Sequence, residues 1–392
     1  MTAILDRRTL LRSAAIAGSA ALIPRVAHAG SAPGLDAVAR TRNLRFGSAF
    51  AWSRPGADAG SFTNARYSRL LTRDCGLVVP ENEMKWQFTR PSAAAFRLDR
   101  LDAMIAFADA EAMAVRGHTL LWHYDRWFPQ WLNDHDFGAR PAAEAEWLLT
   151  THIATLAQRY GPVICSYDVV NEAVDPETGT LRETVLSNAM GGAQPVLDLA
   201  FHAAREAAPH AELVYNDFMS WEAGHEPHRA GVLQLLEGFR RRGTPVDALG
   251  IQSHIKIADR TSSIAGLVAR NTPGWRAFLD EVTAMGFRLV ITEFDVRDHG
   301  LPSGVAPRDR GVAEYAGAYL DMMLSYPEVN DVVVWGMSDK YSWLRGFDPR
   351  SDGEMTRGCP FDAKLRPKPL RDAIARALLA APMRAPAPKR GM

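Results

Sequence analysis

Residues 164–170 read ICSYDVV and residues 211–215 read AELVY, and between them residues 195–208 carry apolar side chains at spacings of three and four. Short apolar segments of this kind predict buried β-strands, and the spacing predicts an α-helix. A strand, a helix and a second strand in this order favour a parallel βα unit. The same unit recurs along most of the chain.

The recurring units predict the fold class. Segments that we interpret as strands cover residues 44–49, 77–80, 114–120, 164–170, 211–215, 248–251, 288–291 and 331–335. Helical periodicity marks residues 98–111, 142–160, 195–208, 227–242, 274–285 and 310–326. Eight strands that alternate with helices predict an α/β fold of the (β/α)8 TIM-barrel type, in one catalytic domain. An open doubly wound sheet is less favoured because no G-x-G-x-x-G follows the first strand.

The composition is that of a globular protein without an expected polyanionic partner. The chain has 392 residues, of which 47% are hydrophobic and 23% charged, enough for a large core. Lys plus Arg and Asp plus Glu each number 45, which argues against nucleic acid as a ligand. Cys75, Cys165 and Cys359 lack the spacing of a zinc site, and no H-E-x-x-H motif occurs. We therefore expect no metal and no cofactor. At most one disulfide could form, and buried free thiols are favoured.

Both ends of the chain differ from the middle. Arg7 and Arg8 precede an apolar stretch at residues 14–23 and the A-x-A site of residues 27–29, which predicts a twin-arginine signal peptide over residues 1–29. No segment reaches the ~20 apolar residues that span a bilayer. We expect a catalytic domain over residues 30–379, periplasmic or secreted and not bound to a membrane once the signal is removed. Residues 380–392, rich in Ala, Pro and Arg, predict a disordered tail.

Polar side chains stand where the predicted strands end, which in a (β/α)8 barrel is the face that carries the chemistry. They follow consecutive strands from the second to the eighth: Glu81-Asn82-Glu83, Gly117-His118-Thr119, Asn171-Glu172, Asn216-Asp217, Gln252-Ser253-His254, Glu293 with Asp295, and Trp335. Such a series describes the lining of one pocket.

Two glutamates in this series suit the hydrolysis of a glycosidic bond. That reaction uses one carboxyl group to protonate the leaving oxygen and a second as the nucleophile when configuration is retained. Glu172 and Glu293 each directly follow a β-rich apolar segment and should project from the barrel rim. A single such glutamate could be a solvated loop residue, but a pair at the fourth and seventh strands favours catalysis.

Seven segments of the chain resemble the family 10 glycoside hydrolases, the (β/α)8 xylanases, in the same order and spacing. They are VVPENEMKW (residues 78–86), VRGHTLLWH (115–123), YDVVNEA (167–173), YNDF (215–218), LGIQSHI (249–255), LVITEFDV (289–296) and VVVWGMSDKYSWL (332–344). The resemblance covers residues 40–375 approximately.

The resemblance implies a role for each matching residue. Glu172 would be the general acid/base and Glu293 the nucleophile, supported by His254, Asp295 and Asn171, the last on the 2-hydroxyl of the sugar. Substrate-binding residues would be Glu81, Asn82, Lys85, His118, Trp122, Tyr215, Gln252, Trp335 and Trp343. One departure stands out, because the family usually has Ser-Gln after Trp-His and this chain has Tyr124-Asp125. A carboxylate in place of the amide would alter the glycone side of the pocket.

The expected protein is thus a retaining endo-1,4-β-xylanase, EC 3.2.1.8, monomeric, with xylan or xylo-oligosaccharides as its partner. Two alternatives stay open. The same residues could act on short xylo-oligosaccharides or β-1,4-glucosides, or the barrel could bind carbohydrate without cleaving it.

Overall fold

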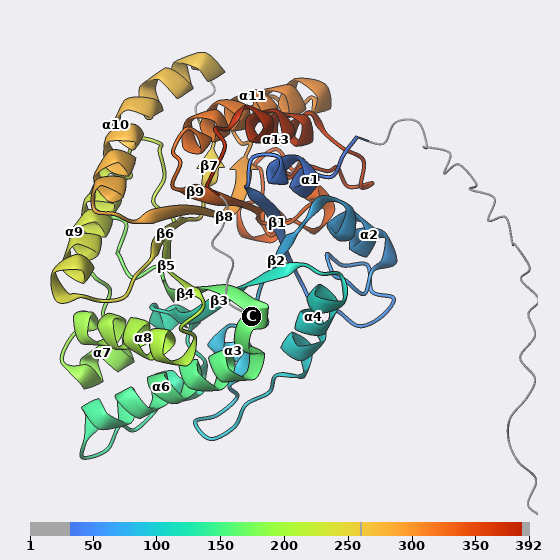
Figure 1. Cartoon of the computed structure of the whole chain (residues 1–392). Coiled ribbons are helices and arrows are strands. Elements are labelled where there is room, and N and C mark those ends of the chain that lie inside the picture. Colours follow the sequence, from blue (N-terminus) through green and yellow to red (C-terminus); the bar gives the residue numbers. More distant parts are fainter. Residues whose placement is uncertain (1–31, 259–260, 386–392) are drawn as a thin grey trace, which may run out of the picture. The chain divides into compact units, whose positions relative to one another are not determined.

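The computed structural model describes residues 32–258 and 261–385 of the chain. Parallel strands at its centre form a closed barrel (Figure 1): β1 (Arg45–Phe50), β2 (Leu77–Pro80), β3 (Ala114–Trp122), β4 (Ile164–Asn171), β5 (Glu212–Asp217), β6 (Ala248–Ile251), β8 (Arg288–Arg297) and β9 (Val329–Val334). β1 pairs with β2 and β9, and β6 pairs with β8, so this ring has no open edge. The predicted (β/α)8 fold is confirmed.

β7 (His254–Lys256) is a short strand that the sequence did not predict. It pairs in parallel with the far end of β8, with His254 opposite Asp295 and Lys256 opposite Arg297. β8 itself was predicted as residues 288–291 and runs on to Arg297. The prediction stopped early because polar residues interrupt the apolar run where the strand enters the functional face.

Helices cover the outside of the barrel (Figure 1). The long ones are α2 (Ala65–Asp74), α4 (Asp99–Ala110), α6 (Pro141–Tyr160), α8 (Ala193–Ala207), α9 (Glu226–Arg242), α10 (Ile264–Ala284), α11 (Val305–Leu324) and α13 (Pro369–Ala380). The short ones are α1 (Leu35–Arg40), α3 (Trp86–Thr89), α5 (Gln130–Asn133), α7 (Val185–Met190) and α12 (Leu344–Phe347). The six predicted helices are all present, and α2 and α13 were missed.

α10 begins ten residues before its predicted start at residue 274. The side chain of Ser263 accepts a hydrogen bond from the backbone N–H of Gly266, which caps the new start. Pro273 lies inside the helix. A proline costs an interior helix a hydrogen bond, and here tertiary packing of the apolar face outweighs that cost.

The chain stays ordered past residue 379, where the tail was expected to begin. Ala381 and Arg384 are buried. The Arg384 guanidinium donates to the backbone oxygens of Val329, Leu324 and Tyr326 at 2.8–2.9 Å. The expectation of a disordered segment from residue 380 is therefore wrong for residues 380–385, because composition did not reveal the buried arginine. Residues 386–392 and the predicted signal peptide lie outside the described residues.

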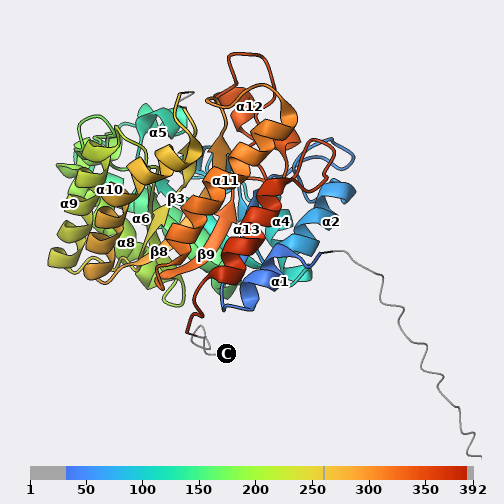
Figure 2. The same cartoon turned by 90° about the horizontal axis from the view of Figure 1, so that it is seen from above.

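The barrel interior combines apolar side chains with a buried ion pair. Val214, Ala248 and Val290 form one apolar cluster. Arg116 and Asp168, both almost fully buried, contact each other at 2.6 Å. Figure 2 shows α5 and α12, which follow β3 and β9, at one end of the barrel and α1 at the other. The end with α5 and α12 is the one at which the strands terminate.

None of the helices in the described part of the chain is long and apolar enough to cross a membrane.

Candidate active site

A cleft of about 930 Å³ lies at the C-terminal ends of the strands. Every predicted site residue lines it except Asp295 and Tyr215. Side chains from β3, β4, β7 and β8 and from the segments that follow β2, β3, β4, β5, β6 and β9 contribute to its wall. The strand-end rule thus placed the cleft correctly.

Glu172 follows β4 and is held by two donors. Trp122 Nε1 donates to Glu172 Oε2 at 2.9 Å, and Gln252 Nε2 donates to Glu172 Oε1 at 2.8 Å. The backbone of Glu172 is left-handed, with φ 56°, and its N–H donates to the carbonyl oxygen of Asn216 at 2.9 Å. A non-glycine residue in this region costs about 1–2 kcal/mol, so the contacts with neighbouring strands hold a strained residue in place.

Glu293 lies on β8 and has a different set of partners. Asn216 Nδ2 donates to Glu293 Oε1 at 2.8 Å. His254 Nε2 lies 3.4 Å from Glu293 Oε2, and His118 Nδ1 lies 4.0 Å from Oε1. The groups around this carboxyl are hydrogen-bond donors, which favour its ionised form.

Side-chain amides connect the two glutamates. Asn216 Nδ2 donates to Glu293 and also to Asn171 Oδ1 at 2.9 Å. Gln252 Nε2 donates to Glu172 and lies 3.4 Å from the same Asn171 oxygen. The Asn171 oxygen is therefore occupied, and its Nδ2 group is left to donate to a ligand in the cleft.

The surroundings move the pKa values of the two glutamates in opposite directions. Burial raises the pKa of Glu172 most, and the negative charges of Asp217 and Glu293 raise it further, against the donors Gln252 and Trp122. Burial alone would also raise the pKa of Glu293, but the charge of His118 and the hydrogen bond from His254 bring it below its ordinary value. The surroundings therefore favour the protonated form of Glu172 and the ionised form of Glu293.

Burial is the main cause of the raised pKa of Glu172. The negative charge of Asp217 raises this pKa more than the negative charge of Glu293 does. The direction is as the chemistry requires.

His254 is fixed by Asp295 and Trp343. Its Nδ1 lies 2.9 Å from Asp295 Oδ1, and Trp343 Nε1 donates to Asp295 Oδ2 at 2.6 Å. Burial disfavours the imidazolium, but Asp295 and Glu293 together raise the pKa of His254 to about 9. Asp295 therefore acts behind His254, off the cleft wall, in the position the resemblance implied.

The residues after β2 form the part of the wall that the resemblance assigns to the glycone side. Lys85 Nζ donates to Asn82 Oδ1 at 3.0 Å and lies 4.7 Å from the centre of the Trp122 ring. Burial lowers the pKa of Lys85, and nearby carboxylates oppose this. Burial raises the pKa of Glu81, while the charge of Lys85 opposes this.

His118 links the cleft to the barrel interior. Its Nδ1 lies 2.9 Å from Asp168 Oδ2, and its ring contacts Trp335 edge to face at 5.1 Å. Asp168 was absent from the predicted site. Its partner Arg116 keeps the pKa of Asp168 low even though burial would raise it, so His118 faces a carboxylate on each side.

Tyr215 does not contact the cleft, so its predicted role in substrate binding is wrong. Its side chain has no exposed surface, packs against Phe239 of α9 and donates to Asp217. Side chains alternate along a strand, and since Asn216 points into the barrel towards Glu293, Tyr215 must point outward. The YNDF segment marked the right strand end but the wrong residue.

Asp125 does not face the cleft either. Its carboxylate accepts from the backbone N–H of Val185, the first residue of α7, at 3.1 Å, and is absent from the cleft wall. Tyr124 does line the cleft, with the guanidinium of Arg182 4.3 Å from its ring centre. The Asp125 carboxylate, which was expected to alter the glycone side of the pocket, therefore lies outside the cleft. Tyr124 is the residue of this pair that lines the cleft wall.

Several residues of the site had no assigned role in the sequence-based prediction. Asn216 and Asp217 were noted only as strand-end residues, without roles. Trp127, whose ring stacks on Trp122 at 4.6 Å, lines the cleft, and so do Phe218 and His225. The last three stand in loops, where sequence periodicity gives no signal.

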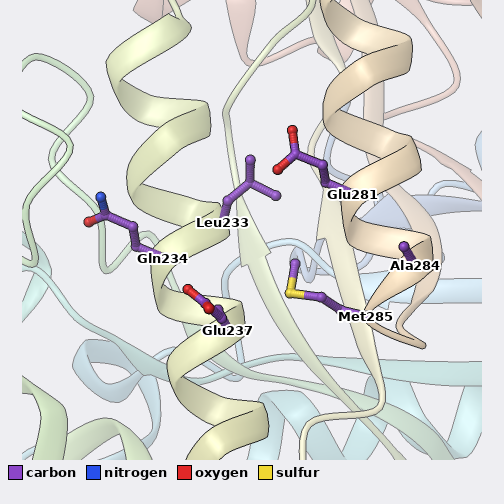
Figure 3. Close-up of a pocket in the computed structure, with 6 residues that line it drawn as sticks. All are labelled: Leu233, Gln234, Glu237, Glu281, Ala284 and Met285. Atoms are coloured by element: carbon purple, nitrogen blue, oxygen red, sulfur yellow. The ribbon is translucent and has the colours of Figure 1, made fainter.

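A second hollow lies on the outer surface, away from the strand ends. Figure 3 shows the six residues that line it, which are Leu233, Gln234 and Glu237 on α9 and Glu281, Ala284 and Met285 at the end of α10. It contains none of the predicted site residues. Nor does the described part of the chain bring three or more His, Cys, Asp or Glu side chains together as metal ligands.

Known proteins resemble this chain over most of its length. The family model for glycosyl hydrolase family 10 matches residues 34–377. Endo-1,4-beta-xylanase 3 of Hypocrea jecorina is 30% identical over 337 residues, 86% of this chain and 83% of its own. Endo-1,4-beta-xylanase B of Thermotoga neapolitana is 28% identical over 343 residues, 87% of this chain and 90% of its own.

Solved structures agree with these relatives. Xylanase 10B from Thermotoga maritima superposes with a TM-score of 0.74 at 29% identity, covering 88% of this chain and 98% of its own. Xylanase 10B from Thermotoga petrophila, solved in complex with xylobiose, gives a TM-score of 0.75 at 28% identity, with 89% and 98% covered. With the barrel, the cleft and this match, the chain belongs to glycosyl hydrolase family 10 and is a glycoside hydrolase.

Proposed function

We propose that the protein is a retaining endo-1,4-β-xylanase in which Glu172 is the acid/base and Glu293 the nucleophile. The observation that carries this proposal is the pair of buried carboxyl groups in one cleft with opposite pKa shifts. Xylan as the substrate is supported by the relatives, which are named as endo-1,4-beta-xylanases.

In the first step a Glu293 oxygen attacks the anomeric carbon and forms a glycosyl ester. The bond between that carbon and the leaving oxygen breaks, and the Glu172 proton moves to the leaving oxygen. The donors around Glu293 keep it ionised for the attack, and the Asn171 amide can donate to the 2-hydroxyl as charge develops on the ring.

In the second step Glu172, now ionised, takes a proton from water. The resulting hydroxide attacks the anomeric carbon, and the ester bond to Glu293 breaks, so configuration is retained overall. Esterification of Glu293 removes a negative charge that raises the pKa of Glu172. Glu172 therefore becomes more acidic once the intermediate has formed, which suits its change from acid to base.

The test compares Glu172→Ala and Glu293→Ala on xylan and on an aryl xylobioside with an acidic phenol. A good leaving group needs no proton, so Glu172→Ala should still release phenol in a burst while its xylan turnover falls by about 10²–10⁴-fold. Glu293→Ala should be inactive on both substrates. Glu281→Ala, at the outer hollow, is the control.

Product analysis completes the test. The first sugar released from a β-xylan, followed by NMR, should be the β-anomer, and α-product would refute retention. A fall in viscosity early in the reaction would identify endo cleavage. Xylo-oligosaccharide binding without hydrolysis by the intact enzyme would instead support the non-catalytic alternative.

We also propose export by the twin-arginine route, on the sequence of residues 1–29 alone. N-terminal sequencing of the protein from a bacterial periplasm or medium should give a start near Gly30, and replacement of Arg7 and Arg8 by Lys should retain the precursor in the cytoplasm.

A further inference from the structure

Tyr124 and Asp125, where the chain departs from the usual pattern of its family, begin a short turn that ends at Trp127. The segment is a single turn of 3-10 helix, in which the backbone N–H of Trp127 donates to the Tyr124 oxygen at 2.9 Å. The backbone oxygen of Asp125 accepts from Asn133 Nδ2 at 2.9 Å, and its carboxylate accepts from the N–H of Val185 at 3.1 Å. The turn therefore holds Trp127 at a fixed place on the cleft wall.

The ring of Trp127 stacks on the ring of Trp122. Their ring centres are 4.6 Å apart, and the ring planes differ by 18°. The backbone of Trp122 is fixed because it ends β3 in register with Asn171 of β4. Strand pairing does not fix the rotation of an indole about its side-chain bonds, so groups packed against the ring set its direction. Trp127 is one such group, and Lys85, whose Nζ lies 4.7 Å from the ring centre, is another.

The direction of the Trp122 indole determines a contact of Glu172. Trp122 Nε1 donates to Glu172 Oε2 at 2.9 Å, while Gln252 Nε2 donates to the other carboxyl oxygen at 2.8 Å. Together these donors fix the plane of the carboxyl group. A hydrogen bond weakens steeply when its angle falls below about 120°, so a tilted indole would release one side of the carboxyl group. A proton donor in turn works only while it stays aligned with the leaving oxygen.

We propose that Trp127 is a positioning residue, which holds the Trp122 indole so that the Glu172 carboxyl group faces the leaving oxygen. The inference rests on the proposed function, because it assigns Trp127 to the proton transfer at the same bond. A stacked aromatic ring suits this task, since it restrains a neighbouring indole in one plane without competing for its Nε1–H. The turn that begins at Tyr124 thus reaches the reaction through two aromatic rings.

The test is a series of aryl xylobiosides whose phenols differ in acidity. Acidic phenols leave without a proton, whereas unsubstituted phenol needs the proton of Glu172, and kcat/KM reports this first step. In Trp127→Leu, kcat/KM should stay within about twofold of wild type for the acidic phenols and fall about tenfold for unsubstituted phenol. Trp127→Phe, which keeps a stacked ring, should follow the wild type. All substrates carry the same xylobiosyl group, so weaker sugar binding would lower every value equally.

The pH profile supplies a readout that a loss of packing alone would not give. The hydrogen bond from Trp122 lowers the pKa of Glu172, whereas removal of Glu172 from water raises it. Release of the indole in Trp127→Leu should therefore raise this pKa and move the alkaline limb of kcat/KM for phenyl xylobioside to higher pH. A limb that moves to lower pH would show that water has entered, and it would contradict the proposal.

A double-variant cycle tests whether Trp127 acts through Trp122. Trp122→Phe removes the Nε1 donor, so the addition of Trp127→Leu should change the leaving-group dependence little further. Trp147→Leu, which removes an exposed indole from α6, is the matched control and should behave as wild type. Should Trp127→Leu fail to fold, Trp127→Met serves in the same cycle.

Two outcomes overturn the positioning role of Trp127. One is an equal loss on every phenol in Trp127→Leu, and the other is a full additional effect of this change in the Trp122→Phe background. A wild-type protein that cleaves none of the aryl xylobiosides would overturn the proposed function itself.

Discussion

At the scale of single residues, the two glutamates differ in what surrounds them. The carboxyl group of Glu293 is contacted by the donors Asn216 and His254. The pKa of Glu172 is instead raised by the negative charge of Asp217. Asp217 is fully buried and accepts from Tyr215, from the backbone N–H of Phe218 and from His228 Nε2. These contacts keep a negative charge close to the acid/base without exposing it to solvent.

Asp217→Asn should therefore shift the pH dependence. Loss of the negative charge lowers the pKa of Glu172, which must be protonated in the first step, so the alkaline limb of the kcat/KM profile should move to lower pH. Asp198→Asn, which removes a surface carboxylate from an ion pair with Arg242, is the matched control. An alkaline limb that stays in place would rule out this role.

Gly250 leaves space for Asn216. A Cβ atom at this position would lie 2.4 Å from Asn216 Oδ1, so Gly250→Ala should displace the amide that donates to Glu293. We expect kcat to fall about tenfold or more with a folded protein. Gly274→Ala in α10, where the nearest atom is 3.9 Å away, should keep kcat. Circular dichroism melting would separate lost activity from lost fold, and full activity in Gly250→Ala would contradict the prediction.

The sequence alone was sufficient to predict which residues line the cleft when those residues stand at the end of a strand. Glu172, Glu293 and His254 were placed in one cleft on that rule, and the structure brings them together. Tyr215 failed because a motif does not say which of two adjacent strand residues points inward. Asp217 acts through burial and charge, which depend on residues distant in the chain.

At the scale of elements, the loops after β3 and β4 are tied to each other. Asp125 accepts from Val185 at the start of α7, and His123 Nε2 lies 3.0 Å from the Arg182 oxygen. Arg182 in turn covers the ring of Tyr124. The wall beside Glu172 is thus built from two loops that support each other.

Asp125→Ala should act on stability more than on substrate binding. The lost hydrogen bond to the first turn of α7 resembles the loss of a helix cap, about 1 kcal/mol of unfolding free energy. Because the carboxylate does not line the cleft, KM for xylohexaose should change less than about twofold, within the range of surface substitutions. Denaturant unfolding and steady-state kinetics measure the two effects. A large rise in KM at unchanged stability would show that Asp125 reads the substrate after all.

Elements were predicted well where periodicity is strong and poorly where tertiary contacts decide. β2 and β6 agree with their predicted bounds, since each is an uninterrupted buried apolar run. β7 was not predicted because three residues are too few to show a hydrophobic periodicity. The strand is defined by its pairing with β8.

At the scale of the whole molecule, residues from both ends of the described chain complete the base of the barrel. Arg384 donates through its backbone N–H to the Arg42 oxygen, and Asn43 Nδ2 donates to the Arg384 oxygen at 2.7 Å. Arg371 of α13 contacts the buried Asp74 of α2 at 2.8 Å. Pairs of residues that stand 297 and 341 positions apart in the chain thus meet near β1.

Arg384→Ala should lower the unfolding free energy by about 2–4 kcal/mol, because three backbone oxygens lose a charged donor in a buried place. A chain ending at Ala385 should melt like the full chain, and one ending at Ala380 should melt at a lower temperature. Calorimetry compares the three proteins. Equal melting temperatures for all of them would mean that the segment contributes nothing.

The left-handed backbone at Glu172 lowers the stability of the fold at a residue that the proposed reaction requires. Glycine adopts that conformation without strain. Variants of the protein that are selected in the laboratory for heat tolerance alone should therefore acquire glycine or asparagine at position 172. These variants should lose activity. Only selection for growth on the polymer would restore the acid. The strain at position 172 is therefore retained because the proposed reaction needs a glutamate there.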